Sequence, residues 1–383
     1  MTHTVHLLVG TTKGAFILTS EDRHAWEVSG PHCDGWCINH MAADPDTGML
    51  WAGGGDDWSG AGVWRSSDGG TTWTVAQLSS GERDKWAAQD PDFAAMIGWT
   101  DTPPVFGDEL HSVWSLRHAH GALWAGAKPG TLLKSSDNGE TWEKNDALAS
   151  FPGREDWNPG AAGLTLHTIV TSPDDPAKIW LGISAAGVFA SEDGGASWER
   201  RNRLSNAESC ADHPHPAAPS NGETGHCVHN MVRAKGSDLL YQQNHHGVWR
   251  SNDGGRHWHD ITEGLPSTFG FPVAVDPHDP QRIWTLPLNG DSAGRYPPDA
   301  SAAVWASEDG GNNWTAKRKG LPQQNCFFTV LRQAMTTDTR NDTGVYFGTN
   351  SGSVFGSRDR GETWNEVARH LPTVLSVEAV ELH

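Results

Sequence analysis

The sequence has no long apolar run and is short of basic residues and cysteine. No stretch approaches the roughly 18 consecutive apolar residues of a membrane-spanning helix, so we expect no membrane partner. Lys and Arg number 28 against 47 Asp and Glu, a formal net charge of −19 at pH 7. This balance argues against nucleic acid, because a polyanion is bound by basic surfaces. Five cysteines are an odd number and too few for a disulfide scaffold.

The first residues, MTHTVHLLVGTTKG, lack a basic segment followed by an apolar one and a small-residue cleavage site. A secretory leader is therefore not expected. Together with the absence of a disulfide framework, this predicts a cytoplasmic location.

One octapeptide, by contrast, recurs six times. Its copies begin at residues 66, 135, 191, 251, 307 and 357 and read SSDGGTTW, SSDNGETW, SEDGGASW, SNDGGRHW, SEDGGNNW and SRDRGETW. SEDRHAW at 20–26 is a degenerate seventh copy, one residue short and without the glycine. In a chain with 44 Gly and 22 Pro, such repeats predict short strands joined by tight turns.

This S-x-D-x-G-x-x-W repeat resembles the Asp-box (BNR) repeat of the sialidase-like β-propellers, and the resemblance covers the whole chain. It implies four-stranded blades in which each box is the turn between the third and fourth strands. The Ser and Asp side chains of such a turn bond to backbone N–H groups, Gly takes a positive φ, and Trp packs between blades. The boxes therefore predict a fold and carry no chemistry.

The strands between the boxes repeat as well. First strands are expected near NHMAADP, LHSVWSL, LHTIVTSP, VHNMVRAK, FPVAVDP, FFTVLRQ and VLSVEAVEL. At the N-terminus, HLLVGTT, GAFILTS and WEVSG supply only second, third and fourth strands. We expect the C-terminal VLSVEAVEL to complete that blade and close the ring, which leaves no open sheet edge. The prediction is an all-β, seven-bladed β-propeller that forms a single domain over residues 1–383.

The strand directions place the boxes on one face of the disc, called here the box face. The second-to-third and fourth-to-first connections lie on the opposite, upper face. The long insertions all fall on the upper face, at 77–109, 144–163, 201–226 and 288–301, and loops that grow often hold function.

Five tryptophans also fall in upper-face connections, at positions 36, 58, 86, 99 and 157. We predict that Trp36, Trp58 and Trp157 bind substrate together with His245. The alternative is that these tryptophans pack the insertions against the blades.

Histidines recur on the first strands. Alignment on the apolar pattern places His111, His167 and His229 at one position, with Asn39 beside them and His40 one residue on; later blades place Phe271, Phe328 and Leu375 there. First strands surround the axis, so these imidazoles should converge, and borderline metals favour imidazole ligands. We predict that His40, His111, His167 and His229 bind a divalent transition metal, zinc or iron. A metal-free site for a polar or anionic ligand and inert packing remain the alternatives.

The cysteines form a second constellation. Cys33 and Cys37 with a nearby His have a spacing that allows zinc binding, and Cys210 and Cys227 have one that allows a disulfide. Lone cysteines in a cytoplasmic protein are more often small buried side chains.

These patterns favour a cytoplasmic metal-dependent enzyme, of hydrolase or lyase type with a redox role also open, acting on a small molecule at the axis. Asp108, Glu109 and His246 are its predicted catalytic groups. One alternative is a non-catalytic binding or assembly scaffold. Another is a glycoside hydrolase that uses a pair of upper-face carboxylates, drawn from Asp56, Asp57, Asp108, Glu109, Glu155, Asp156 and Asp291.

Sialidase chemistry itself is not expected. The N-terminal F/Y-R-I-P motif of sialidases is absent. Their nucleophile is a tyrosine, and of the three tyrosines here Tyr241 and Tyr346 align with core positions of second strands, which leaves only Tyr296.

Overall fold

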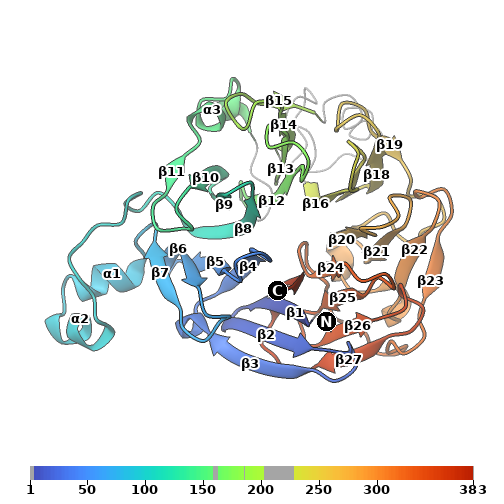
Figure 1. The fold of residues 1–383 in the computed structure, drawn as a ribbon, viewed down its shortest axis with the longest axis horizontal. Coiled ribbons are helices and arrows are strands. Elements are labelled where there is room, and N and C mark those ends of the chain that lie inside the picture. The colour runs from blue at the N-terminus through green and yellow to red at the C-terminus, as the bar shows by residue number, and fades with distance from the viewer. Residues whose placement is uncertain (1–3, 158–162, 185, 202–227, 383) are drawn as a thin grey trace.

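The computed structural model describes residues 4–157, 163–184, 186–201 and 228–382. It consists of seven four-stranded antiparallel sheets arranged in a ring (Figure 1). Each sheet is one blade, with its first strand innermost. The predicted seven-bladed β-propeller is therefore confirmed.

Six blades are built from four strands each. The first three are β4 (Ile38–Ala43), β5 (Leu50–Asp56), β6 (Gly60–Ser66) and β7 (Thr74–Gln77); β8 (Ser112–Ala119), β9 (Ala122–Lys128), β10 (Thr131–Ser135) and β11 (Glu143–Lys144); and β12 (Leu166–Thr171), β13 (Ile179–Ile183), β14 (Gly187–Ser191) and β15 (Glu199–Arg200). The next three are β16 (Val228–Arg233), β17 (Leu240–Asn244), β18 (Gly247–Ser251) and β19 (His259–Asp260); β20 (Gly270–Val275), β21 (Ile283–Pro287), β22 (Val304–Ser307) and β23 (Thr315–Lys317); and β24 (Met335–Thr337), β25 (Val345–Gly348), β26 (Val354–Ser357) and β27 (Asn365–Ala368).

The seventh blade joins the two ends of the chain. It combines the C-terminal strand with three N-terminal ones: β28 (Val374–Glu381), β1 (Val5–Thr11), β2 (Gly14–Ser20) and β3 (Glu27–His32). β28 pairs with β1 along its whole length, from Val5 opposite Glu381 to Thr11 opposite Val374. The predicted closure of the ring by the C-terminal strand is thus confirmed.

The few helices lie in the connections between strands. They are α1 (Glu82–Ala87), α2 (Pro91–Ile97), α3 (Asp146–Ala149) and the 3₁₀ turns η1 (Cys33–Gly35), η2 (Arg154–Asp156), η3 (Asp291–Ala293) and η4 (Pro298–Ala300). In Figure 1, α1 and α2 project from the ring beside β7. No helix in the described part of the chain is long and apolar enough to cross a membrane.

The octapeptide turns share one hydrogen-bond pattern. In the copy at 191–198, Ser191 Oγ donates to Asp193 Oδ1 at 2.8 Å and accepts from the N–H of Gly195 at 2.8 Å. Asp193 in turn accepts from the N–H and the hydroxyl of Ser197. The other five copies repeat the two serine bonds and the backbone bond to the aspartate. Gly195 has φ +90°, which only glycine adopts at little cost.

Second-strand tryptophans connect each blade to the next. The indole N–H of Trp51 donates to Asn138 O at 2.9 Å, and that of Trp180 donates to Gly254 O at 2.9 Å. Both acceptors lie in the octapeptide turn of the following blade. These rings are buried, so each large apolar side chain also has its one polar group satisfied.

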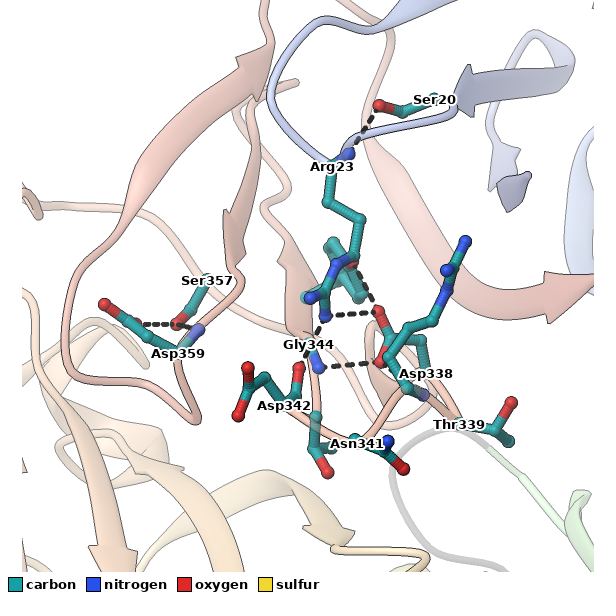
Figure 2. A network of polar contacts seen from close by, with 12 residues as sticks. Ser20, Arg23, Asp338, Thr339, Asn341, Asp342, Gly344, Ser357 and Asp359 are labelled. Atoms are coloured by element: carbon teal, nitrogen blue, oxygen red, sulfur yellow. Dashed lines mark hydrogen bonds and ion pairs between the residues drawn. The ribbon is translucent and has the colours of Figure 1, made fainter. Parts of the chain in front are cut away.

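The degenerate copy at 20–26 makes a different connection (Figure 2). Arg23 has a positive φ in the shortened turn, and its backbone N–H donates to Ser20 Oγ at 2.8 Å. Its guanidinium bonds to Asp338 Oδ2 at 3.2 Å and to Asp342 O at 2.5 Å. Asp338 is buried and also accepts from the N–H of Gly344 at 2.7 Å. This network joins the blade that closes the ring to the β24–β27 blade.

The sixth first strand differs from prediction. FFTVLRQ was expected to form it, but β24 begins at Met335, after that segment. The apolar side chains of Phe328 and Val330 pack into the core formed by the β20–β27 region. The end of the segment instead enters the channel, where Gln333 Nε2 donates to His167 O and Asn230 Nδ2 donates to Arg332 O at 2.8 Å.

Candidate functional site

The register of the first strands separates the predicted metal ligands. Six of these strands have a register shift of the β-bulge type. In four of them the bulged residues are Asn39, Trp114, His167 and His229, and in the other two the shift falls at Phe271–Pro272 and at Leu375. His111 lies three residues before Trp114, ahead of β8, and is exposed with Nδ1 3.5 Å from Asp57 Oδ1. The alignment of His111 with the other two histidines was therefore wrong by three residues.

His167 and His229 lie inside the channel and are fully buried. His167 Nδ1 is 2.9 Å from Thr168 Oγ1, and His229 Nδ1 is 2.5 Å from Gly270 O. The Nε2 atoms of both rings are buried and have no hydrogen-bond partner among the described residues. Burial holds both pKa values well below the usual range, and Arg332 lowers both further, so the rings are neutral.

His40 follows Asn39, the bulged residue of β4. Its Nδ1 accepts the N–H of Leu116 at 3.0 Å, which places the ring proton on Nε2. Burial, with a contribution from Arg117, lowers its pKa to about 4.

The described residues contain no group of three or more His, Cys, Asp or Glu side chains arranged to hold one metal ion. His40, His111, His167 and His229 therefore do not form the single site predicted for zinc or iron. The register of His111 removes one of the four predicted ligands from the channel.

Of the predicted cysteine pairs, Cys210 and Cys227 lie outside the described residues. Cys33 and Cys37 are free thiols. Burial raises the pKa of both, that of Cys37 to about 11. This favours the neutral thiol over the thiolate that zinc binds.

The predicted catalytic groups come from two different blades. Asp108 and Glu109 follow the insertion between β7 and β8, and Glu109 is paired with Lys144. His246 lies in the turn between β17 and β18, on another blade. His245, in the same turn, has its ring 4.4 Å from that of His229.

The three predicted substrate-binding tryptophans have different environments. Trp157 is buried, with its ring 4.9 Å from that of Phe189, which fits the packing alternative. Trp58 is 44% exposed and contacts Trp86 on α1, with 5.5 Å between the ring centroids. Trp36 packs edge-on against Trp64 at 5.6 Å and lines a pocket.

This pocket lies between the β4–β7 blade and the α1–α2 insertion, and its volume is about 480 Å³. Its aromatic lining is Trp36, Trp64 and Trp99, and its charged lining is Asp34, Arg83, Asp84, Lys85 and Asp101. The guanidinium of Arg83 lies 5.4 Å from the centre of the Trp36 ring. Trp36 and Trp64 are buried in the wall of the pocket, and Trp99 is half-buried. An aromatic face such as that of Trp99, beside carboxylates and cations, suits a ligand with both apolar C–H faces and many hydroxyls.

Local sequence explains how the insertion forms the pocket wall. Asp84 on α1 accepts from Gln77 Nε2 and from the N–H of Gly81, both at 2.8 Å, and so fixes the start of the helix to β7. Asp90 caps α2 by accepting from the N–H groups of Asp92 and Phe93, and Pro91 follows at the first helical position. Gly98 ends α2 with φ +64°, and Trp99 then turns into the pocket.

Asp34 and Asp101 were missed by the sequence analysis. Both are exposed and line the pocket from different segments, Asp34 on η1 and Asp101 after α2. Asp84 is committed to hydrogen bonds with α1 and β7, so these two are the accessible carboxylates of the pocket. One signal was present in the sequence, since each stands two residues from a loop tryptophan, in D-G-W and W-T-D.

No family model matches the chain. It is similar to an oligoxyloglucan-reducing end-specific xyloglucanase from Emericella nidulans, 22% identical over 218 residues, which are 50% of this chain and 25% of that protein. A xyloglucanase from a Paenibacillus species is 28% identical over 223 residues, 50% of this chain and 19% of that protein. The chain thus matches a quarter or less of the length of these curated relatives.

Among solved structures, the GH74 xyloglucanase from Xanthomonas campestris is 18% identical. Its TM-score is 0.62, and the match covers 96% of this chain and 53% of that one. At this identity the likeness shows the fold alone.

These findings overturn the leading functional prediction. A metal-dependent enzyme acting on a small molecule at a histidine site is not supported, because the similar curated proteins are xyloglucanases and the described histidines do not converge on one ion. The glycoside hydrolase alternative fits the comparisons better than the leading prediction did.

Proposed function

We propose that the protein is a glycoside hydrolase whose substrate, a xyloglucan-type polysaccharide or its oligosaccharides, binds in the pocket beside the α1–α2 insertion. The observation that carries this proposal is the pocket's combination of Trp36, Trp64 and Trp99 with two accessible carboxylates. The names of the curated relatives support the substrate class. A polysaccharide replaces the small-molecule substrate of the sequence-based prediction.

The reaction needs only this chain's own carboxyl groups. In glycoside hydrolysis one carboxylic acid protonates the leaving oxygen, while a second carboxylate activates water or attacks the anomeric carbon. Asp34 and Asp101 take these two roles in the proposal. Trp99 provides a face for a sugar ring, and Arg83 and Lys85 donate hydrogen bonds to hydroxyls.

The test is release of reducing ends from xyloglucan and from xyloglucan oligosaccharides. Asp34→Asn and Asp101→Asn are each expected to lower kcat by roughly 100-fold or more, because each removes an acid or base from the transition state. Trp99→Ala should mainly raise KM. Asp57→Asn, an exposed carboxylate outside the pocket, is the matched control and should retain full activity.

Two results would contradict the proposal. Oligosaccharide binding without any release of reducing ends would indicate a glycan-binding disc instead of a hydrolase. Hydrolysis that is unchanged in both aspartate variants would place the catalytic pair elsewhere.

A further inference from the structure

A second cavity opens where the channel meets the box face. It has a volume of about 360 Å³ and is lined by residues from all seven first strands and from the turns that follow them. It shares no lining residue with the proposed glycan pocket. Its inner end is closed by side chains that connect strands across the channel, among them Asn230 and Gln333. A ligand therefore reaches it from the box face.

The charge of this cavity is opposite to that of the protein. Its lining contains Arg117, Arg233 and Lys235 but only one acidic residue, Glu378, in a chain with net charge −19. None of the three cations forms an ion pair within the described part of the chain. Nearby, by contrast, Lys178 is paired with Asp238 at 2.8 Å.

Both guanidinium groups are held in position by neighbours. Arg117 Nε donates to Thr171 Oγ1 at 3.2 Å, which leaves its two terminal nitrogens to bind a ligand. Arg233 lies over the Trp180 ring, with 5.6 Å from Cζ to the ring centroid, and its buried Nε has no partner among the described residues. Fixed guanidinium groups lose little side-chain entropy when they bind an oxyanion and can do so with two hydrogen bonds each.

His40 adds a neutral hydrogen-bond donor to the lining of the cavity. His40 carries its proton on Nε2, since Nδ1 accepts from the backbone. Burial raises the pKa of Glu378, although Arg117 opposes the shift.

We propose that this cavity binds a small organic oxyanion, a phosphate ester or a carboxylate of about monosaccharide size, through Arg117, Arg233 and Lys235. The proposal does not depend on the glycan pocket, because the two sites are lined by different residues. The volume of the cavity lies at the lower end of the range for small-molecule sites. It is too small to enclose a polymer.

Isothermal titration at pH 7.5 and low ionic strength tests the proposal with four probes: inorganic phosphate, glucose 6-phosphate, citrate and glucose. We expect saturable binding of one molecule of glucose 6-phosphate or of citrate and none of glucose. Affinity should fall as salt is added, because salt screens the charges. Tighter binding of glucose 6-phosphate or of citrate identifies the anionic group as phosphate or carboxylate.

Variants locate the binding. Arg117→Met and Arg233→Met should each weaken anion binding at least about tenfold, because each removes charge-assisted hydrogen bonds. Arg65→Gln, whose partner Glu140 lies on the surface, is the matched control and should bind normally. Glu378→Gln removes the one acidic residue of the cavity lining and should bind at least as tightly as the wild type.

Circular dichroism and thermal melts establish that each variant is folded before titration. Absence of saturable binding of all three anions to the wild type would overturn the proposal. So would unchanged affinity in both folded arginine variants.

Discussion

Three buried imidazoles make the stability of the protein depend on pH. His40, His167 and His229 are neutral in the fold because burial lowers their pKa values, that of His40 to about 4. In the unfolded chain they titrate near 6.5. Between the folded and unfolded pKa values, the unfolded chain binds more protons than the folded protein. The contribution of these neutral histidines to stability is therefore fully present above pH 6.5 and is lost as pH falls toward 4.

We therefore predict that the free energy of unfolding falls between pH 6.5 and 4, by up to about 1.4 kcal/mol per pH unit for each of these histidines. Urea denaturation at pH 7.5, 6 and 5 measures this slope. His40→Asn should make the slope shallower, even if it lowers stability at pH 7.5. His24→Asn, an exposed position, should leave the slope unchanged, and equal slopes in both variants would contradict the assignment.

Among the structural elements, the octapeptide turn owes its shape to one buried hydroxyl. Ser191 Oγ satisfies the N–H of Gly195 and holds the Asp193 carboxylate that accepts from Ser197. These bonds lower the pKa of Asp193 to about 2, so the turn stays intact through the acid range in which the histidines titrate.

Ser191→Ala should lower the free energy of unfolding by about 1–3 kcal/mol, because it leaves the buried N–H of Gly195 without an acceptor. Denaturant titration measures the change. Ser197→Ala in the same turn is the control; its side chain is exposed, and the effect should be smaller. Equal effects would mean that the buried hydroxyl has no special role.

How far the sequence predicts the structure also depends on the element. The turns are specified locally, by residues within eight positions of one another, so their repeats predicted seven blades and the closing strand. The β-bulges are set by contacts between strands, which is why HSVW was aligned three residues out of register. FFTVLRQ has the apolar pattern of a strand, but its side chains pack into a neighbouring core instead.

The candidate pocket was less predictable than the fold. Trp36 was singled out because it stands in a connection outside the strands. Asp34 and Asp101 are 67 positions apart in the chain (101 − 34) and meet only because the α1–α2 insertion folds back on the β4–β7 blade. The spacing of the two residues in the sequence does not predict how the insertion packs on the blade.

For the molecule as a whole, two features contribute to holding the closing blade in place. One is the pairing of β1 with β28. The other is the bond from Arg23 to buried Asp338, which joins that blade to the β24–β27 blade (Figure 2). Loss of Arg23 leaves a buried carboxylate with one charged partner fewer.

We predict that Arg23→Gln lowers the free energy of unfolding by about 1–3 kcal/mol. Thermal and urea denaturation measure the loss. Arg65→Gln breaks an exposed pair with Glu140 and should cost less than about 1 kcal/mol. If Asp338→Asn combined with Arg23→Gln is no more stable than Arg23→Gln alone, the unpaired charge is not the cause.

The pairing of β1 with β28 also has a consequence for protein synthesis. Of the strands of this propeller, β1 leaves the ribosome first, but its partner strand begins at Val374. At about 5–20 residues per second, roughly 20 to 70 s pass before β28 is translated. Throughout that interval β1 presents the unpaired edge of an incomplete blade, so the nascent chain is most exposed to aggregation and to chaperones just before its last strand emerges.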